Sequence, residues 1–125
     1  AVGGGDTLLL GVGGSGGACT SMSGDGVQRW TARTDGDVQA AELVRNAAGT
    51  VVAWCGGHFN TVAGVDQRKL VAFDADKGTR TGFSTDINSA LGVWGLEASG
   101  STLFAGGDFT KADGVPVNRI VSITR

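Results

Sequence analysis

The chain has 125 residues, of which 41% are hydrophobic, 23 are glycine and one is proline, and its formal net charge is −2. This length suits a single domain with a real core, and the interspersed acidic and basic residues argue against a nucleic-acid partner. No apolar run approaches the roughly 18 residues that a membrane span needs, so no membrane partner is expected.

The first 35 residues predict a set of short strands separated by glycine-rich turns. Thr7 to Gly11 reads as an apolar strand, Ala18 to Met22 as the next strand, and Val27 to Thr31 as an outer strand. Gly11 to Gly16 matches the spacing of a phosphate-binding glycine loop. Because the helix that such a loop requires does not follow, we do not interpret it as a nucleotide site.

The next stretch, residues 36–85, predicts a second set of strands. Val38 to Val44 is expected to be an inner strand, although good helix formers make a helix over 38–46 the competing interpretation. Two further strands are expected at 51–54 and 69–73, and a fourth is expected at 79–83. The turn over 74–78 has acidic residues but lacks the later oxygen ligands of a calcium loop, so no metal is expected there.

The chain then repeats itself at an interval of about 50 residues. The segment Trp54-Cys55-Gly56-Gly57-His58-Phe59 returns as Phe104-Ala105-Gly106-Gly107-Asp108-Phe109. The two copies also match without a gap at Gly64/Gly114, Val65/Val115, Lys69/Arg119, Leu70/Ile120 and Val71/Val121. A repeat of this length indicates a repeated structural unit. Glycines at the end of a strand mark a bulge or a close backbone approach, so we expect the Gly-Gly pair to serve packing.

The size of the repeat favours an all-β fold made of β-propeller-type blades. Each unit would be a sheet of four antiparallel strands, which must stack on its neighbours to bury its faces. We expect a single segment with blade-like repeats at approximately 1–35, 36–85 and 86–125, or about two and a half to three blades in this chain. Closed propellers typically need about four to eight blades. Other protein chains, identical or different, are therefore expected to complete this partial propeller.

Cys19 and Cys55 are the only cysteines in the chain. They lie too far apart for a metal-binding or redox CxxC motif. A disulfide between them is predicted, and this implies an oxidising, extracellular compartment. Two unpaired buried thiols, acting as small hydrophobic side chains, are the alternative.

One family resemblance is carried by the third copy. Residues 106–120 read GGDFTKADGVPVNRI and follow Val93-Trp94-Gly95-Leu96. This pattern resembles the delta-60-type β-propeller repeats of secreted bacterial proteins, which carry a GGDFT-x-x-x-G-x-x-x-x-R core after a V-x-A-L strand. Residues 74–78 resemble the D-x-x-x-G outer turn of those repeats, whereas His58 departs from their aspartate. Kelch repeats are a more distant match. The resemblance implies a propeller in an extracellular setting and no shared catalytic chemistry.

Candidate functional residues are few. His58 is the sole histidine, and neither a nucleophile motif nor an acidic cluster accompanies it, so no catalytic residue, metal site or cofactor is predicted. His58 and Asp108 occupy equivalent positions after the glycine pair and could contact a partner at one rim. Trp30, Trp54 and Trp94 have flat faces on which sugar rings could stack, but core packing is favoured for each; Trp30, near an outer strand, is the one kept as a ligand-binding candidate.

These observations favour a non-catalytic, secreted interaction or scaffold module that works within a larger or oligomeric assembly. A carbohydrate-binding propeller lectin is the alternative. An enzyme acting on polysaccharides, such as a lyase or hydrolase, is the less favoured hypothesis.

Overall fold

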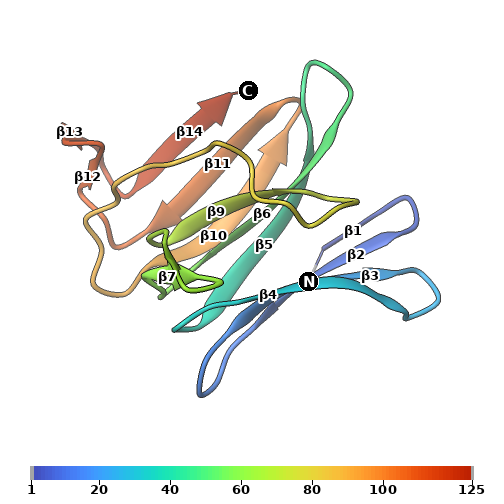
Figure 1. The fold of residues 1–125 in the computed structure, drawn as a ribbon. Helices are drawn as coiled ribbons and strands as arrows, with labels where there is room; N and C mark the ends of the chain where they lie inside the picture. Colours follow the sequence, from blue (N-terminus) through green and yellow to red (C-terminus); the bar gives the residue numbers. More distant parts are fainter. Residues whose placement is uncertain (1, 125) are drawn as a thin grey trace.

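The structure is a computed structural model that describes residues 2–124, and within this range it consists of strands and turns with no helix (Figure 1). The all-β prediction is therefore confirmed. The strands in chain order are β1 (Val2–Gly4), β2 (Thr7–Val12), β3 (Ala18–Ser23), β4 (Gln28–Arg33), β5 (Val38–Arg45), β6 (Val51–Gly57), β7 (Thr61–Val62), β8 (Val65–Asp66), β9 (Leu70–Asp74), β10 (Val93–Ser99), β11 (Thr102–Gly107), β12 (Lys111–Ala112), β13 (Val115–Pro116) and β14 (Ile120–Thr124).

Consecutive strands pair into three main antiparallel sheets. The first sheet has the order β1-β2-β3-β4, the second β5-β6-β9 and the third β10-β11-β14. The strand interpretation of residues 38–46 is thus correct, because β5 pairs along its whole length with β6. The tertiary pairing outweighs the helix propensity of its Ala, Glu and Leu residues.

The expected polar turns around Gly64 and Gly114 contain two small hairpins, β7-β8 and β12-β13. Each hairpin is held by the loop that precedes the inner strand of the second or third sheet. Asp35 Oδ1 accepts hydrogen bonds of 2.8 Å from the N–H groups of Asn60 and Thr61. Asn88 does the same for the second hairpin, with Oδ1 accepting from two successive N–H groups at 3.0 and 2.7 Å.

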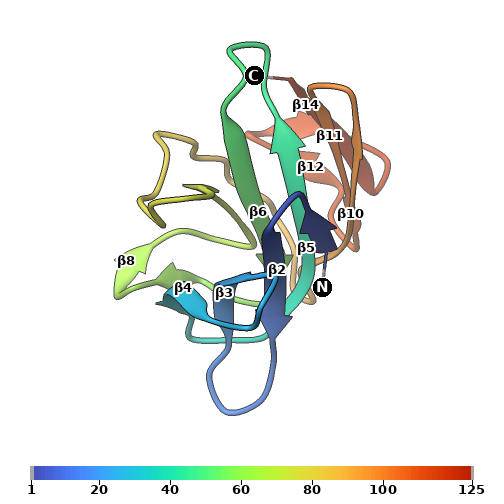
Figure 2. The same ribbon diagram turned by 90° about the vertical axis from the view of Figure 1, so that its right-hand side faces the viewer.

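The three sheets stack in chain order, with β5 packed between β2 and β10 (Figure 2). One buried apolar cluster lies between the first and second sheets and is built around Leu9, Val38 and Phe73. A second cluster lies between the second and third sheets and is built around Trp54 and Leu103. Each sheet is too thin to bury its own faces, so the fold depends on these two interfaces.

The repeat read from the sequence is reproduced in the backbone. Ala63, Gly64 and Lys69 have φ values of 50°, 77° and 65°, and the residues 50 positions later have 50°, 76° and 63°. A positive φ is uncommon for residues other than glycine. Its recurrence at matching places therefore shows that the two copies adopt the same local structure.

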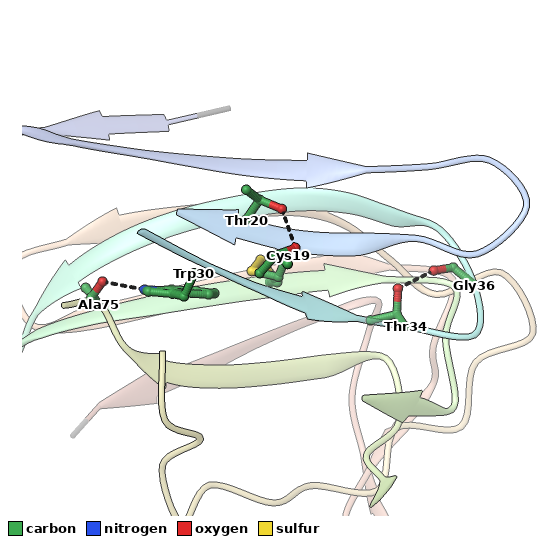
Figure 3. Close-up of a disulfide and its surroundings, with 8 residues drawn as sticks. Cys19, Thr20, Trp30, Thr34, Gly36 and Ala75 are labelled. Atoms are coloured by element: carbon green, nitrogen blue, oxygen red, sulfur yellow. Dashed lines mark hydrogen bonds between the residues drawn. A yellow bond between two sulfur atoms is a disulfide. The ribbon is translucent and has the colours of Figure 1, made fainter. Parts of the chain in front are cut away.

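The predicted disulfide is present and joins Cys19 on β3 to Cys55 on β6, with a Cα–Cα distance of 6.2 Å (Figure 3). Both half-cystines are fully buried in the interface between the first and second sheets. The bond thus links two stacked sheets rather than two strands of one sheet. The thiol alternative is wrong.

The predicted fourth strand over 79–83 does not form. Only one isolated bridge, between Phe73 and Arg80, continues the second sheet in that direction. The chain then leaves the sheet edge because Phe83 turns inward and packs edge-on against Trp54, with ring centroids 4.7 Å apart. Burying this large aromatic side chain outweighs the few additional ladder hydrogen bonds.

Candidate interaction surface

The glycine pairs create the close approach on which the stacking depends. A Cβ added at Gly56 would lie 2.6 Å from Cγ1 of Val93 on the next sheet. Gly11 stands in the same relation to Val38, whose Cγ1 would be 2.9 Å away. Gly57 faces inward instead, towards the bulged start of its own inner strand. The packing role expected for the Gly-Gly motif is confirmed, since only a residue without Cβ fits these contacts.

Gly106 stands at the equivalent place on the third sheet, and no valine covers it in the described part of the chain. The nearest atom to an added Cβ would be the Arg119 carbonyl oxygen at 3.7 Å. The face around it, which we call the terminal face, carries Phe104, Gly106 and Ile120 on β11 and β14. These residues line a shallow groove of about 350 Å³, together with Gly95, Leu96 and Glu97.

Comparison with the second sheet shows what the terminal face lacks. Phe104 matches Trp54 in the repeat, yet it is 38% exposed where Trp54 is 3% exposed. Ile120 matches Leu70, and their exposures are 56% and 0%. The pairing is the same in both sheets, with Ile120 opposite Gly106 and Leu70 opposite Gly56. The residues therefore differ in exposure because another sheet covers one face and not the other.

A second apolar surface lies at the opposite end of the stack, on the face of the first sheet that points away from the second. We call it the leading face. Side chains alternate along β2 and β3, so those not turned towards the second sheet form this face. Leu8 and Val12 are exposed large hydrophobic residues, and Leu10 and Met22 are half-buried.

The third sheet also ends in an unpaired edge. In the described residues β14 pairs only with β11, whereas the matching strand of the first sheet, β3, is covered by β4. A groove of about 470 Å³ is lined by Val121 and Ile123 of β14 together with Val115 of β13 and residues of the loop over 83–87. An open edge flanked by apolar side chains is a common place for an added strand.

Trp30, the sugar-stacking candidate, lies between the first and second sheets (Figure 3). Its Nε1 donates a 2.8 Å hydrogen bond to the Ala75 carbonyl oxygen. Its ring packs against Phe73 at a centroid distance of 5.0 Å, and a Cβ at Gly78 would clash with it. The indole is thus engaged in holding the outer turn of the second sheet, and its ligand role stays a prediction.

His58 and Asp108 follow their glycine pairs as predicted but have different surroundings. The His58 side chain is exposed, and the backbone N–H of His58 donates a 2.8 Å hydrogen bond to the Asp37 carbonyl oxygen. Asp108 instead anchors the loop before β10. Its carboxylate accepts hydrogen bonds from the Ser89 hydroxyl and, at 3.1 Å, from the N–H groups of Leu91 and Gly92. Contact with a ligand stays a prediction for both residues.

The hydrogen bonds that anchor the loop also lower the pKa of the Asp108 carboxylate. Burial works to raise its pKa, but the hydrogen bonds from the three loop residues together outweigh burial and hold the pKa below its usual value. Asp35 is shifted in the same direction. The N–H of Thr61, followed by that of Asn60, lowers the pKa of Asp35. Both carboxylates therefore stabilise the loops in their ionised form.

Trp94 was expected in the core, and this expectation is wrong, because its side chain is 51% exposed. It sits at the bulge between Val93 and Gly95, where it has no paired residue on β11. Its Nε1 donates 3.2 Å to the Leu91 carbonyl oxygen, and the side chain of Leu91 is exposed beside it. The repeat contained a signal for this exposure, since the residue following the matching Val38 is the polar Gln39.

One further pocket, of about 250 Å³, opens between the second and third sheets. Its lining is mainly apolar, and the polar side chains in it are those of Asn46, Thr81 and Ser101. Trp54 contributes to the lining but is nearly fully buried, so it offers no free ring face. In residues 2–124 no group of three or more His, Cys, Asp or Glu side chains is placed to hold a metal ion.

Comparison of the chain with protein-family models, curated proteins and solved structures finds no match. Residues 2–124 contain no helix that could span a membrane.

Proposed function

We propose that this chain is a non-catalytic interaction module of β-propeller type that acts in a larger or oligomeric assembly outside the cell. The three main sheets correspond in this proposal to blades. The single observation that carries it is the uncovered terminal face, where Phe104 and Ile120 repeat the positions of buried Trp54 and Leu70. Contiguous exposed apolar surface of this kind marks an interaction site.

The disulfide supports the extracellular part of the proposal. Disulfides persist in oxidising compartments, and the Cys19–Cys55 bond indicates such a compartment. Small β modules with thin sheets gain most from such a link, because their apolar cores are limited.

The test asks whether the terminal face is covered in the working protein. The assembly that contains the chain is isolated under native conditions from the extracellular medium in which the chain occurs, and its surface is labelled with a short-lived carbene. The purified chain at high dilution is labelled in the same way. We expect Phe104 and Ile120 to be protected in the native sample and labelled in the dilute one, while exposed Val27 is labelled equally in both. Equal labelling of the terminal face in the two samples would remove the basis of the proposal.

Carbohydrate binding is the second candidate, favoured by one observation. Trp94 offers an exposed ring beside the Leu91 loop, and sugar rings stack on such flat apolar faces. A glycan array probed with the full chain tests this candidate. Binding that is lost in Trp94→Ala and kept in Gln39→Ala, the matching position of the second sheet, would support it. An array without any bound glycan would leave the lectin candidate without support.

A further inference from the structure

We propose that a second copy of this chain docks head to tail on the first, with its leading face covering the terminal face. This inference rests on the proposed function and names the partner and the register of contact. It follows from the two sheet interfaces already present inside the chain, of which the new contact would be a continuation.

The register can be read from matching positions. In the first interface Cys19 meets Cys55, and both are fully buried. Cys19 pairs with Gly11, and in the same way Leu70 pairs with Gly56 and Ile120 with Gly106. Leu70 and Ile120 therefore occupy the place of Cys19 in their sheets. Fully buried Ala105 occupies the place of Cys55 in the third sheet. The same position in each interface therefore holds a disulfide in one case and aliphatic side chains in the other.

The leading face supplies the missing partner of Ile120. The gapless match of Leu8-Leu9-Leu10-Gly11 with Leu103-Phe104-Ala105-Gly106 places Leu10 at the position of Ala105 and Cys55. Leu10 lies on the free side of β2, where Leu8 and Val12 are exposed. The chain thus carries both halves of one apolar interface at its two ends. In the docked pair, Leu10 of one copy would lie opposite Ile120 of the other.

This contact is heterologous, because two different faces meet. Each copy keeps one free face after docking, so association either closes into a ring or continues as a filament. A two-fold dimer that pairs identical faces is not expected.

Two variants, each with one added cysteine beside the native Cys19–Cys55 disulfide, test the register. Leu10→Cys and Ile120→Cys are prepared separately, one of them labelled with ¹⁵N, mixed, and oxidised mildly. The cross-linked species are identified by mass spectrometry without reduction. We expect the mixed dimer to dominate over either like pair, because the native disulfide at the matching position shows that this place suits a bond. Val27→Cys, exposed on the turn between β3 and β4, replaces Leu10→Cys in the control mixture and should give no preference.

The uncross-linked chain provides the second measurement. Light scattering and native mass spectrometry over a concentration series are expected to show association, and Ile120→Lys should raise the dissociation constant by about ten- to a hundredfold through loss of one buried aliphatic side chain. Because Ile120 is more than half exposed, this variant should keep the fold.

The outcomes separate this inference from the proposed function. A monomeric chain at all concentrations, or cross-linking that does not exceed the control, overturns docking of a second copy. If the terminal face is nevertheless protected in the native sample, the interaction module stands and its partner is a different chain. If the face is labelled there as strongly as in the dilute chain, both proposals fail.

Discussion

Substitution of alanine for Gly56 or Gly106 gives a direct measure of what the stacking contributes. Both glycines occupy the same place in their repeats, and neither has a positive φ, so alanine is conformationally acceptable at each. At Gly56 the new methyl group would lie 2.6 Å from Cγ1 and 3.0 Å from Cβ of fully buried Val93. At Gly106 the nearest atom would be 3.7 Å away, which is ordinary van der Waals contact.

The expected free-energy changes have opposite signs. Carbon atoms pack at about 3.5–4.0 Å, so Gly56→Ala must displace Val93 by about 1 Å, and overpacking of this kind costs about 1–3 kcal/mol. Gly106→Ala meets no such obstacle and restricts the unfolded chain, which stabilises the fold by about 0.4–1 kcal/mol. Restriction of the unfolded chain is common to both variants, so they should differ by the overpacking cost, roughly 1–3 kcal/mol in the free energy of unfolding.

Urea denaturation at high dilution, followed by tryptophan fluorescence, measures this difference without association between copies. The m-values should agree among the two variants and the parent chain, because the surface exposed on unfolding is the same. If Gly56→Ala and Gly106→Ala change the free energy of unfolding equally, the close approach of the second and third sheets is not what selects glycine. The packing account of the repeat would then be refuted.

Three further predictions concern the stability of the fold. Replacing both half-cystines by alanine should lower the free energy of unfolding by about 4 kcal/mol, the loop-closure value for a sequence separation of 36, as measured by urea denaturation. Hydrogen bonds lower the pKa of Asp35 and Asp108 in the folded chain. The stabilisation of the fold by these two carboxylates is therefore present above the unfolded-state pKa of about 3.8 and is lost as the pH falls below it. The urea midpoint of the parent chain should fall in this acidic range, and it should fall less in Asp35→Asn and in Asp108→Asn. Phe83→Ala should lower the free energy of unfolding by about 3–5 kcal/mol, because it removes the ring that packs against Trp54. The fluorescence of Trp54 should then shift to longer wavelength.

Each of these has a contradicting result. A cystine-free variant within about 1 kcal/mol of the parent would show that the bond does not restrict the unfolded chain. A urea midpoint with the same acid dependence in both asparagine variants as in the parent would assign that dependence to other carboxylates. An unchanged emission spectrum in Phe83→Ala would mean that its ring does not shield the indole from water.

The repeat by itself determined the class of fold and much of its local structure. The glycine pairs predicted close packing, and the structure places Gly56 and Gly57 against two different neighbours. The second and third sheets, the disulfide and the strand over Val38–Arg45 were all predictable, because spacing and pattern act along the chain. The unit boundaries and the resemblance to secreted propeller repeats remain predictions.

Other features were decided only by tertiary contacts. The sequence predicted a strand at 79–83, yet Phe83 packs against Trp54 and does not continue the sheet edge. Trp94 fits the pattern of a core residue, yet it lies at the bulge between Val93 and Gly95 and is exposed. The exposure of the terminal face could not be predicted from the sequence either, because Ile120 is as apolar as Leu70. Local patterns specify which side chains need covering, but only the stacked arrangement of sheets decides which of them are covered.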